Sequence, residues 1–161
     1  MDVGNADKTH TISLCVIGDD ASSIDKDIDD IGGFDCTQMP YVYGGSHDTD
    51  LSGDVLYPLY AIDNYQVKIL IARDADYIYA NMIMLARGAA AIHIDCRKPY
   101  FYIYDDEYIL SDKMISILTA YGMKVVHGID DLTYELGMVK KAFMHAADNA
   151  EPGLFDFNYL I

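Results

Sequence analysis

The chain has 161 residues, of which 52% are hydrophobic and 23% are charged, and its formal net charge is −15. This composition excludes a disordered chain, and the length predicts one domain, residues 1–161, with a core of its own. The acidic excess argues against direct binding to nucleic acid or to anionic lipid, because both depend on cations of the protein. The acidic surface either suits a basic protein partner or simply keeps the protein soluble.

The expected setting is the cytoplasm. No apolar run reaches the roughly 18 residues of a membrane span, and the N-terminus lacks the pattern of a secretory signal. The three cysteines are an odd number without a CxxC pair, which favours a reducing compartment. The five histidines do not have the spacing of paired metal ligands, so no metal or cofactor is expected.

The first elements predicted are a strand, a glycine turn and a helix. Residues 10–17 are apolar and β-branched, and Gly18 follows them. Ile24, Ile28 and Ile31 then recur at helical spacing. A phosphate-binding loop occupies this kind of place between a strand and a helix.

The phosphate-binding residues themselves are missing. The motif Gly-x-x-x-x-Gly-Lys-(Ser/Thr) needs its lysine to neutralise phosphate oxygens and its hydroxyl to hold Mg²⁺. Aligned from Gly18, Ser23 stands at the second glycine, Ile24 at the lysine and Asp25 at the hydroxyl, while Lys26 comes two residues late. The surrounding aspartates form either a site that repels phosphate or simply a solvated helix face.

The middle of the chain predicts a loop and then a βαβ unit. Residues 34–53 are rich in Gly, Asp and Ser, which is typical of a loop, and 54–62 predict an edge strand in a hairpin with the next strand. Apolar runs at 67–71 and 89–94 predict buried strands. Apolar residues recur at helical spacing between these two runs, so a parallel sheet is expected.

This same unit resembles a known family. The run Ala-Asp-Tyr-Ile at 75–78 and the run Asn-Met-Ile at 81–83 resemble the segment after switch II of translational GTPases. The elongation factor Tu family has Gly-His-Ala-Asp-Tyr-(Ile/Val)-Lys-Asn-Met-Ile-Thr-Gly-Ala-Ala there, with one residue fewer between the two runs. A weaker likeness extends over 10–146. The resemblance implies a G domain of the P-loop GTPase type.

Two further motifs of that family are degraded here. The family's switch II residues, in Asp-x-Pro-Gly-His, fall on Leu70, Ala72, Arg73 and Asp74, which retain none of the working groups. The guanine motif Asn-Lys-x-Asp falls on 127–130, where only Asp130 is kept. A helix cap is the preferred interpretation of Asp74 and of Asp130 or its neighbour, with a base role for Asp74 as the alternative.

An aromatic segment follows the βαβ unit. Tyr100, Tyr102 and Tyr104 alternate with Phe101 and Ile103, which places three phenols on one face of an added edge strand or flattened loop. The phenols form either a protein-interaction surface or a face folded back on the domain itself.

The last part of the chain predicts two helices and two strands. These are a helix over 110–121, a buried strand over 123–127, a helix over 132–143 and a strand over 154–161. We therefore expect a three-layer α/β sandwich with a mainly parallel sheet of five or six strands, P-loop GTPase-like as the resemblance implies. Its ligand crevice is expected at the carboxyl ends of the strands.

The function expected from this pattern is that of a non-catalytic pseudo-GTPase. It would act as an interaction or assembly module with a basic or translation-related protein partner, without catalytic residues. One alternative is an active GTPase that uses GTP and Mg²⁺, with Lys26 or Arg73 on phosphate and Asp74 as base. Another is an acidic decoy that occupies a basic site on its partner. Any residual nucleotide site would use Gly18, Ser23, Lys26, Arg73, Asp74 and Asp130.

Overall fold

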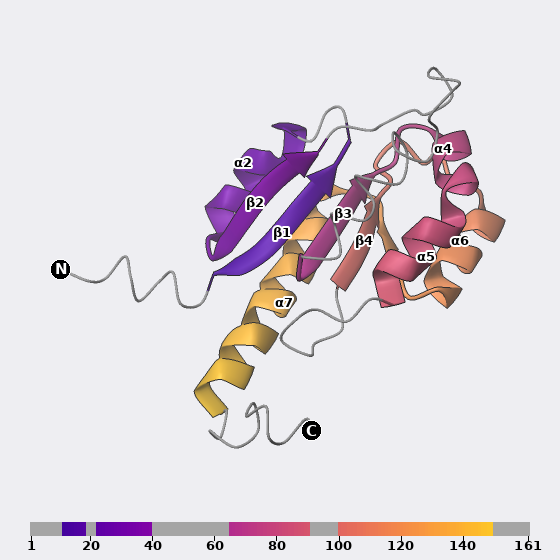
Figure 1. The fold of residues 1–161 in the computed structure, drawn as a ribbon. Helices are drawn as coiled ribbons and strands as arrows, with labels where there is room; N and C mark the ends of the chain where they lie inside the picture. The colour runs from indigo at the N-terminus through magenta and orange to yellow at the C-terminus, as the bar shows by residue number, and fades with distance from the viewer. Residues whose placement is uncertain (1–10, 19–21, 40–64, 91–99, 150–161) are drawn as a thin grey trace, which may run out of the picture.

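The computed structural model describes residues 11–18, 22–39, 65–90 and 100–149 (Figure 1). Helices and strands alternate through most of these residues. In chain order they are β1 (Ile12–Ile17), α2 (Ser22–Ile31), β2 (Phe34–Met39), β3 (Val67–Ile71), α4 (Ala75–Ala80), α5 (Met82–Ala90), β4 (Tyr100–Tyr104), α6 (Asp112–Ala120), β5 (Lys124–Val126) and α7 (Ile129–Asn149).

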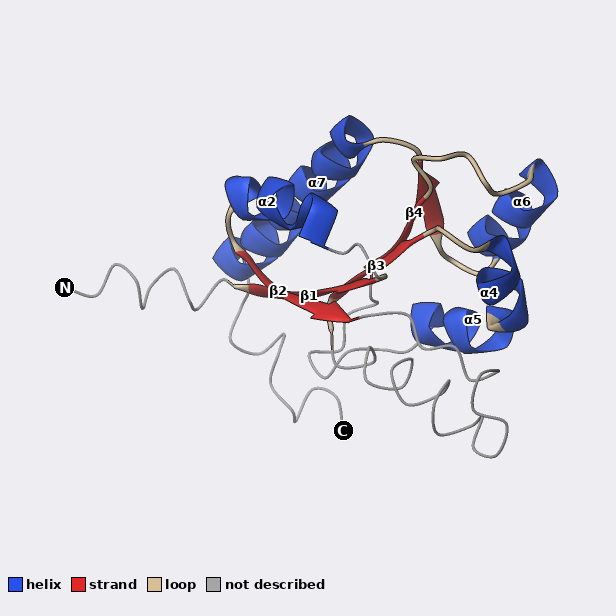
Figure 2. Cartoon of the chain, turned by 90° about the horizontal axis from the view of Figure 1, so that it is seen from above, coloured by secondary structure: helices blue, strands red, loops and turns tan. Residues whose placement is uncertain are grey.

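The strands form one parallel sheet in the order β2-β1-β3-β4-β5. Helices α2 and α7 cover one face, and α4, α5 and α6 lie on the other (Figure 2). The predicted three-layer α/β sandwich with a parallel sheet is therefore confirmed. The strand order reverses between β1 and β3, and in doubly wound sheets of this order ligands bind outside the carboxyl ends of the strands at such a reversal.

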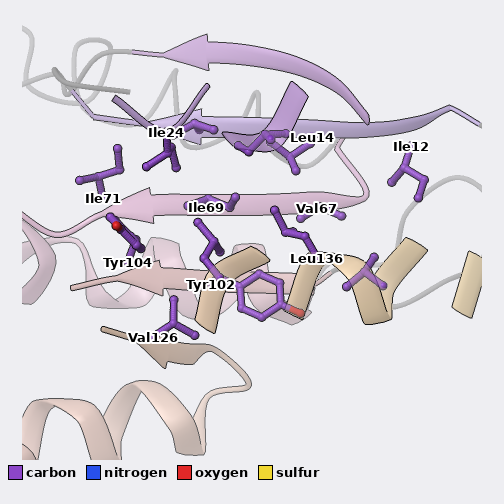
Figure 3. Close-up of a cluster of buried hydrophobic side chains, with 14 residues drawn as sticks. Ile12, Leu14, Ile24, Val67, Ile69, Ile71, Tyr102, Tyr104, Val126 and Leu136 are labelled. Atoms are coloured by element: carbon purple, nitrogen blue, oxygen red, sulfur yellow. The ribbon is translucent and has the colours of Figure 1, made fainter. Parts of the chain in front are cut away.

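The face under α2 and α7 is apolar because alternate residues of each strand point to it. The buried residues of this layer are Ile12, Leu14, Val16, Ile24, Ile28, Val67, Ile69, Ile71, Tyr102, Tyr104, Val126, Leu132, Leu136 and Val139. Leu136 of α7 lies among the strand side chains in Figure 3. Lys140 of the same helix donates a hydrogen bond to the carbonyl oxygen of Ile31 at 3.0 Å, where the negative end of the α2 dipole lies. Helix α7 thus holds the sheet and α2 together.

The opposite face carries the second half of the core. Its buried residues include Cys15 and Ile17 of β1, Leu70 of β3, and Phe101 and Ile103 of β4. Helices α4, α5 and α6 cover them with Ile78, Leu85 and Leu118, among others. Strand β4 alternates, with its tyrosines in the layer under α7 and Phe101 and Ile103 in the layer under α4, α5 and α6, so both of its faces are covered.

Two cysteines within the described residues are free thiols, Cys15 buried and Cys36 partly buried. Burial raises the pKa of the Cys15 thiol to about 12. Burial, together with the nearby carboxylate of Asp25, raises the pKa of Cys36 to about 12. Since the thiolate is the reactive form, we predict that iodoacetamide at about pH 8 leaves both unmodified in the folded protein and alkylates both in urea.

The same two pKa values predict alkaline destabilisation. The folded state holds these protons more tightly than the unfolded chain, so the contribution of the two thiols to the free energy of unfolding should be fully present below about pH 9 and be lost as the pH rises toward 12. Urea unfolding at a series of pH values measures this loss.

In the alkylation experiment, peptide mapping by mass spectrometry distinguishes Cys15 and Cys36 from Cys96, which lies outside the described residues. Equal alkylation rates for Cys15 in folded and unfolded protein would contradict the prediction that the folded protein protects it.

Residues 34–39 form strand β2, where the sequence predicted a loop. The strand pairs with β1 along its whole length, from Ile12 opposite Phe34 to Ile17 opposite Met39. Because β2 is an edge strand, the polar side chains of Asp35 and Gln38 stay exposed, and a segment with such polar residues does not show the apolar pattern of a buried strand. The Gly-, Asp- and Ser-rich composition that predicted the loop belongs to residues 40–53, outside the described part.

The predicted strand over 89–94 is wrong at its start. Ala89 and Ala90 end helix α5, in keeping with the high helix propensity of alanine, while 91–94 lie outside the described residues. The strand that pairs with β3 on this side is β4.

Strand β4 lies inside the sheet between β3 and β5, so its prediction as an added edge strand or flattened loop is wrong. Both edges of β3 are consequently occupied by parallel strands, β1 and β4. The hairpin partner predicted at 54–62 and the last strand predicted at 154–161 lie outside the described residues. The P-loop character that the resemblance implies stays a prediction.

Candidate functional site

The carboxyl ends of the parallel strands meet at one edge of the sheet, which is the usual place for a site in this architecture. In the described part of the chain, four segments follow strands at this edge: Gly18, 72–74, 105–108 and 127–128.

Gly18 is glycine for a structural reason. Its φ of 152° is one that residues with a side chain rarely adopt, and a Cβ there would come within 3.1 Å of the Cβ of Ile71. Its N–H donates to the carbonyl oxygen of Met39 at 2.7 Å. Close approach of β1 and β3 therefore accounts for this glycine without a phosphate. Ser23 and Lys26 lie exposed on α2.

Arg73 follows β3, and its positive charge is paired. Its Nη1 lies 2.6 Å from Oδ1 of Asp106, and its Nε lies 3.8 Å from Oε2 of Glu107. Nη1 also donates to the carbonyl oxygen of Ala72 at 3.1 Å. The Arg73 side chain is 24% exposed, so these carboxylates face it in a partly desolvated place where ion pairs are stronger than on the open surface.

Asp74 caps helix α4, as predicted. Its Oδ1 accepts hydrogen bonds from the backbone N–H groups of Asp76 at 2.9 Å and Tyr77 at 3.2 Å. This oxygen is therefore engaged by the backbone of the helix.

The sequence predicted that Asp130 or Asp131 caps the next helix, and this prediction is wrong. Helix α7 begins at Ile129, and the N–H of Leu132 bonds to the carbonyl oxygen of Gly128, so both aspartates lie inside the first turn. There their charge is favourable because it faces the positive end of the helix dipole. Both side chains are exposed.

Asp105, which follows β4, is a fully buried carboxylate. Its two oxygens accept the backbone N–H groups of Ile109 at 2.9 Å and Leu110 at 3.1 Å, and its own N–H donates to the carbonyl oxygen of Val126. These bonds fix the turn between β4 and α6. Within that turn Tyr108 has a φ of 56°, a conformation that is costly for a bulky residue and is held by its surroundings.

His127, which follows β5, is oriented by this turn. Its Nδ1 lies 2.9 Å from the carbonyl oxygen of Asp105. A carbonyl can only accept, so Nδ1 carries the hydrogen, and in the neutral ring Nε2 is then an acceptor. The ring of Tyr108 stacks on the imidazole with centroids 4.3 Å apart and planes 4° from parallel.

A hollow of about 300 Å³ opens beside β5, the last strand of the sheet. Strand β5 and the residue after it form one wall, and the first two turns of α7 form the other. The lining residues are Lys124, Val125, Val126, His127, Asp131, Tyr134 and Glu135. Lys124 and Glu135 form an ion pair of 2.6 Å in this lining.

The three tyrosines predicted as one face of β4 do share a face, toward α7. Tyr102 and Tyr104 are only 4% and 6% exposed, and Tyr100 packs against the ring of Phe143. Of the two predicted alternatives, the face is folded back on its own domain. The hydroxyl of Tyr102 donates to Oε1 of Glu135 at 3.4 Å, and burial, with the adjacent carboxylate, raises its pKa.

The sequence did not predict the cluster around Asp105, Asp106, Tyr108 and His127. Its one available signal was the acidic run directly after an alternating segment, with a histidine at the end of the next strand. That signal becomes meaningful only once β4 is placed beside β5. The predicted residues Gly18, Arg73 and Asp74 do lie at the same edge of the sheet, whereas Ser23 and Lys26 lie on the surface of α2.

No protein-family model, curated protein or solved structure matches this chain. Among the helices that the structure describes, none is long and apolar enough to cross a membrane. Within the same residues, no group of three or more His, Cys, Asp and Glu side chains is placed to hold a metal ion.

Proposed function

We propose that this chain is a non-catalytic protein-interaction or assembly module that binds a basic protein partner. The sequence resemblance to translational GTPases would make it a pseudo-GTPase. The observation that carries the proposal is the pairing of Arg73 with Asp106 at 2.6 Å. This guanidinium stands at the edge where a nucleotide phosphate would need a cation, and Asp106 and Glu107 already neutralise it.

The charges around Arg73 support the same proposal. Asp74, Asp106, Glu107, Asp130 and Asp131 all belong to segments that begin at the carboxyl edge. At an effective dielectric constant near 20, two like charges about 4 Å apart repel by roughly 4 kcal/mol before salt screening. Arg73 offsets only one of these five negative charges, so the edge keeps a net negative charge that would repel a di- or triphosphate and attract a basic partner.

The alternative of an active GTPase would use Arg73 on phosphate and Asp74 as base, and both residues already make structural contacts. Arg73 is engaged by Asp106, and the Asp74 oxygen caps α4. Residues 19–21, within the expected phosphate loop, lie outside the described residues. The translation setting and the cytoplasmic location rest on the sequence resemblance and on the free cysteines, and they are part of the proposal.

A nucleotide titration tests the non-catalytic part. Addition of GTP or GDP with Mg²⁺ at millimolar concentration is expected to leave the melting temperature unchanged in differential scanning fluorimetry. Binding at a concentration of 100 Kd would add about 2.7 kcal/mol, which corresponds to several degrees for a domain of this size. Such a rise with guanine nucleotides would contradict the proposal.

The acidic decoy remains a special case of this interaction. In both, the acidic edge meets a basic surface, and in the decoy that surface is a nucleic-acid site of the partner. The net charge of −15 favours either form.

A further inference from the structure

The hollow beside β5 is rich in hydrogen-bond acceptors. Asp131 contributes an exposed carboxylate that makes no ion pair within the described residues. Glu135 contributes a second carboxylate. Its Oε2 pairs with Nζ of Lys124 at 2.6 Å, and its Oε1 accepts a hydrogen bond from the Tyr102 hydroxyl at 3.4 Å. Lys124 is 61% exposed, so its ammonium can exchange Glu135 for water at little cost.

His127 belongs to the same lining, and its neutral form adds a third acceptor. Because Nδ1 donates to the carbonyl oxygen of Asp105, the lone pair of the neutral ring is on Nε2, across the ring from that bond. The stacked ring of Tyr108 covers one face of the imidazole and fixes its plane. Bonded at Nδ1 and stacked on one face, the ring is held at the hollow in a fixed orientation.

Flat and apolar surfaces complete the lining. Tyr134 is 67% exposed although it is aromatic, and Val125 and Val126 of β5 provide the apolar part of the wall. A ligand that matches this lining is planar, cationic and carries several N–H donors. The guanidinium of arginine has these properties, with five donors in one plane and a face that stacks on aromatic rings, whereas an ammonium is compact and strongly hydrated.

We propose that this hollow binds an arginine side chain of the basic partner, with the guanidinium on Asp131 and Nε2 of His127 and its flat face against Tyr134. The inference rests on the proposed function and assigns its recognition site. The volume of about 300 Å³ accommodates one such side chain. The positive end of the α7 dipole does not oppose it, because Asp130 and Asp131 already offset that end.

The test is a titration of the ¹⁵N-labelled full chain with N-acetyl-arginine amide, followed by amide chemical shifts. We expect saturable shifts confined to β5, His127 and the first two turns of α7, with millimolar affinity as befits a single side chain. Asp131→Asn should weaken binding by about tenfold, the effect of one charge-assisted hydrogen bond. Asp130→Asn is the matched control, since it removes the same charge from the same helical turn but not from the hollow, and it should leave the affinity within about twofold.

Three results would overturn the inference. One is the absence of saturable shifts in the hollow, another is equal weakening by Asp130→Asn and Asp131→Asn, and the third is equal binding of N-acetyl-lysine amide. Each would remove the arginine site without touching the proposed function, which fails separately if guanine nucleotides bind at the carboxyl edge.

Discussion

Replacing Asp105 by alanine is expected to lower the free energy of unfolding by about 3 kcal/mol. The carboxylate is fully buried and accepts the N–H groups of Ile109 and Leu110, so its removal leaves one partly buried and one buried donor without an acceptor. A buried unsatisfied donor costs about 1–3 kcal/mol, which makes this a larger effect than the loss of any surface ion pair. Urea unfolding of both proteins, monitored by circular dichroism, measures the difference.

Asp106→Ala is the matched control for this change. It removes the neighbouring carboxylate, whose side chain is 33% exposed and whose partner Arg73 retains Glu107, so a loss of about 1 kcal/mol or less is expected. The same experiment has a local readout, because the turn held by Asp105 also carries Tyr108. The ring shifts of His127 should move in Asp105→Ala and stay in place in Asp106→Ala. Equal stability of the two variants would mean that the turn does not depend on the buried carboxylate.

Much of the fold follows from local pattern. The β-branched runs of β1 and β3 predict buried strands, and the Ile24, Ile28 spacing predicts a helix, because each pattern depends on residues only a few positions apart. Helices α6 and α7 and strand β5 were predicted on the same grounds. The errors came where one local pattern is compatible with two different positions in the fold. An alternating run of tyrosines has the same periodicity at an exposed edge and inside a sheet, and only the position of α7 decides between them.

The candidate site was much less predictable, since its contacts join segments distant in sequence. Arg73 and Asp106 are 33 residues apart, and Asp105 and His127 are 22 apart. Both contacts exist because β4 is inserted between β3 and β5, a placement that the residues of β4 do not encode by themselves. The residues recognisable from the sequence, such as Gly18 and Asp74, have structural roles. Gly18 allows the close approach of β1 to Ile71 of β3, and Asp74 caps helix α4.

The packing of α7 on the sheet gives the second large prediction. Leu136→Ala is expected to lower the free energy of unfolding by about 3–4 kcal/mol, because a fully buried leucine loses its contacts and leaves a cavity. The cavity would form in the layer that covers Tyr102 and Tyr104. Urea unfolding measures this loss, and because the chain has no tryptophan, its near-ultraviolet circular dichroism comes mainly from its tyrosines, among them the buried Tyr102 and Tyr104 of this layer.

Met138→Ala supplies the control, on the same helix and two residues away. Met138 is 47% exposed, so its truncation should change the free energy of unfolding by about 0.5 kcal/mol at most, and alanine favours the helix at both positions. The difference between the two variants therefore measures burial and not helix propensity. If Leu136→Ala were no more destabilising than Met138→Ala, α7 would not be packed on the sheet in solution. The phenol face of β4 would then be open, and the hollow beside β5, one wall of which is α7, would lose its shape.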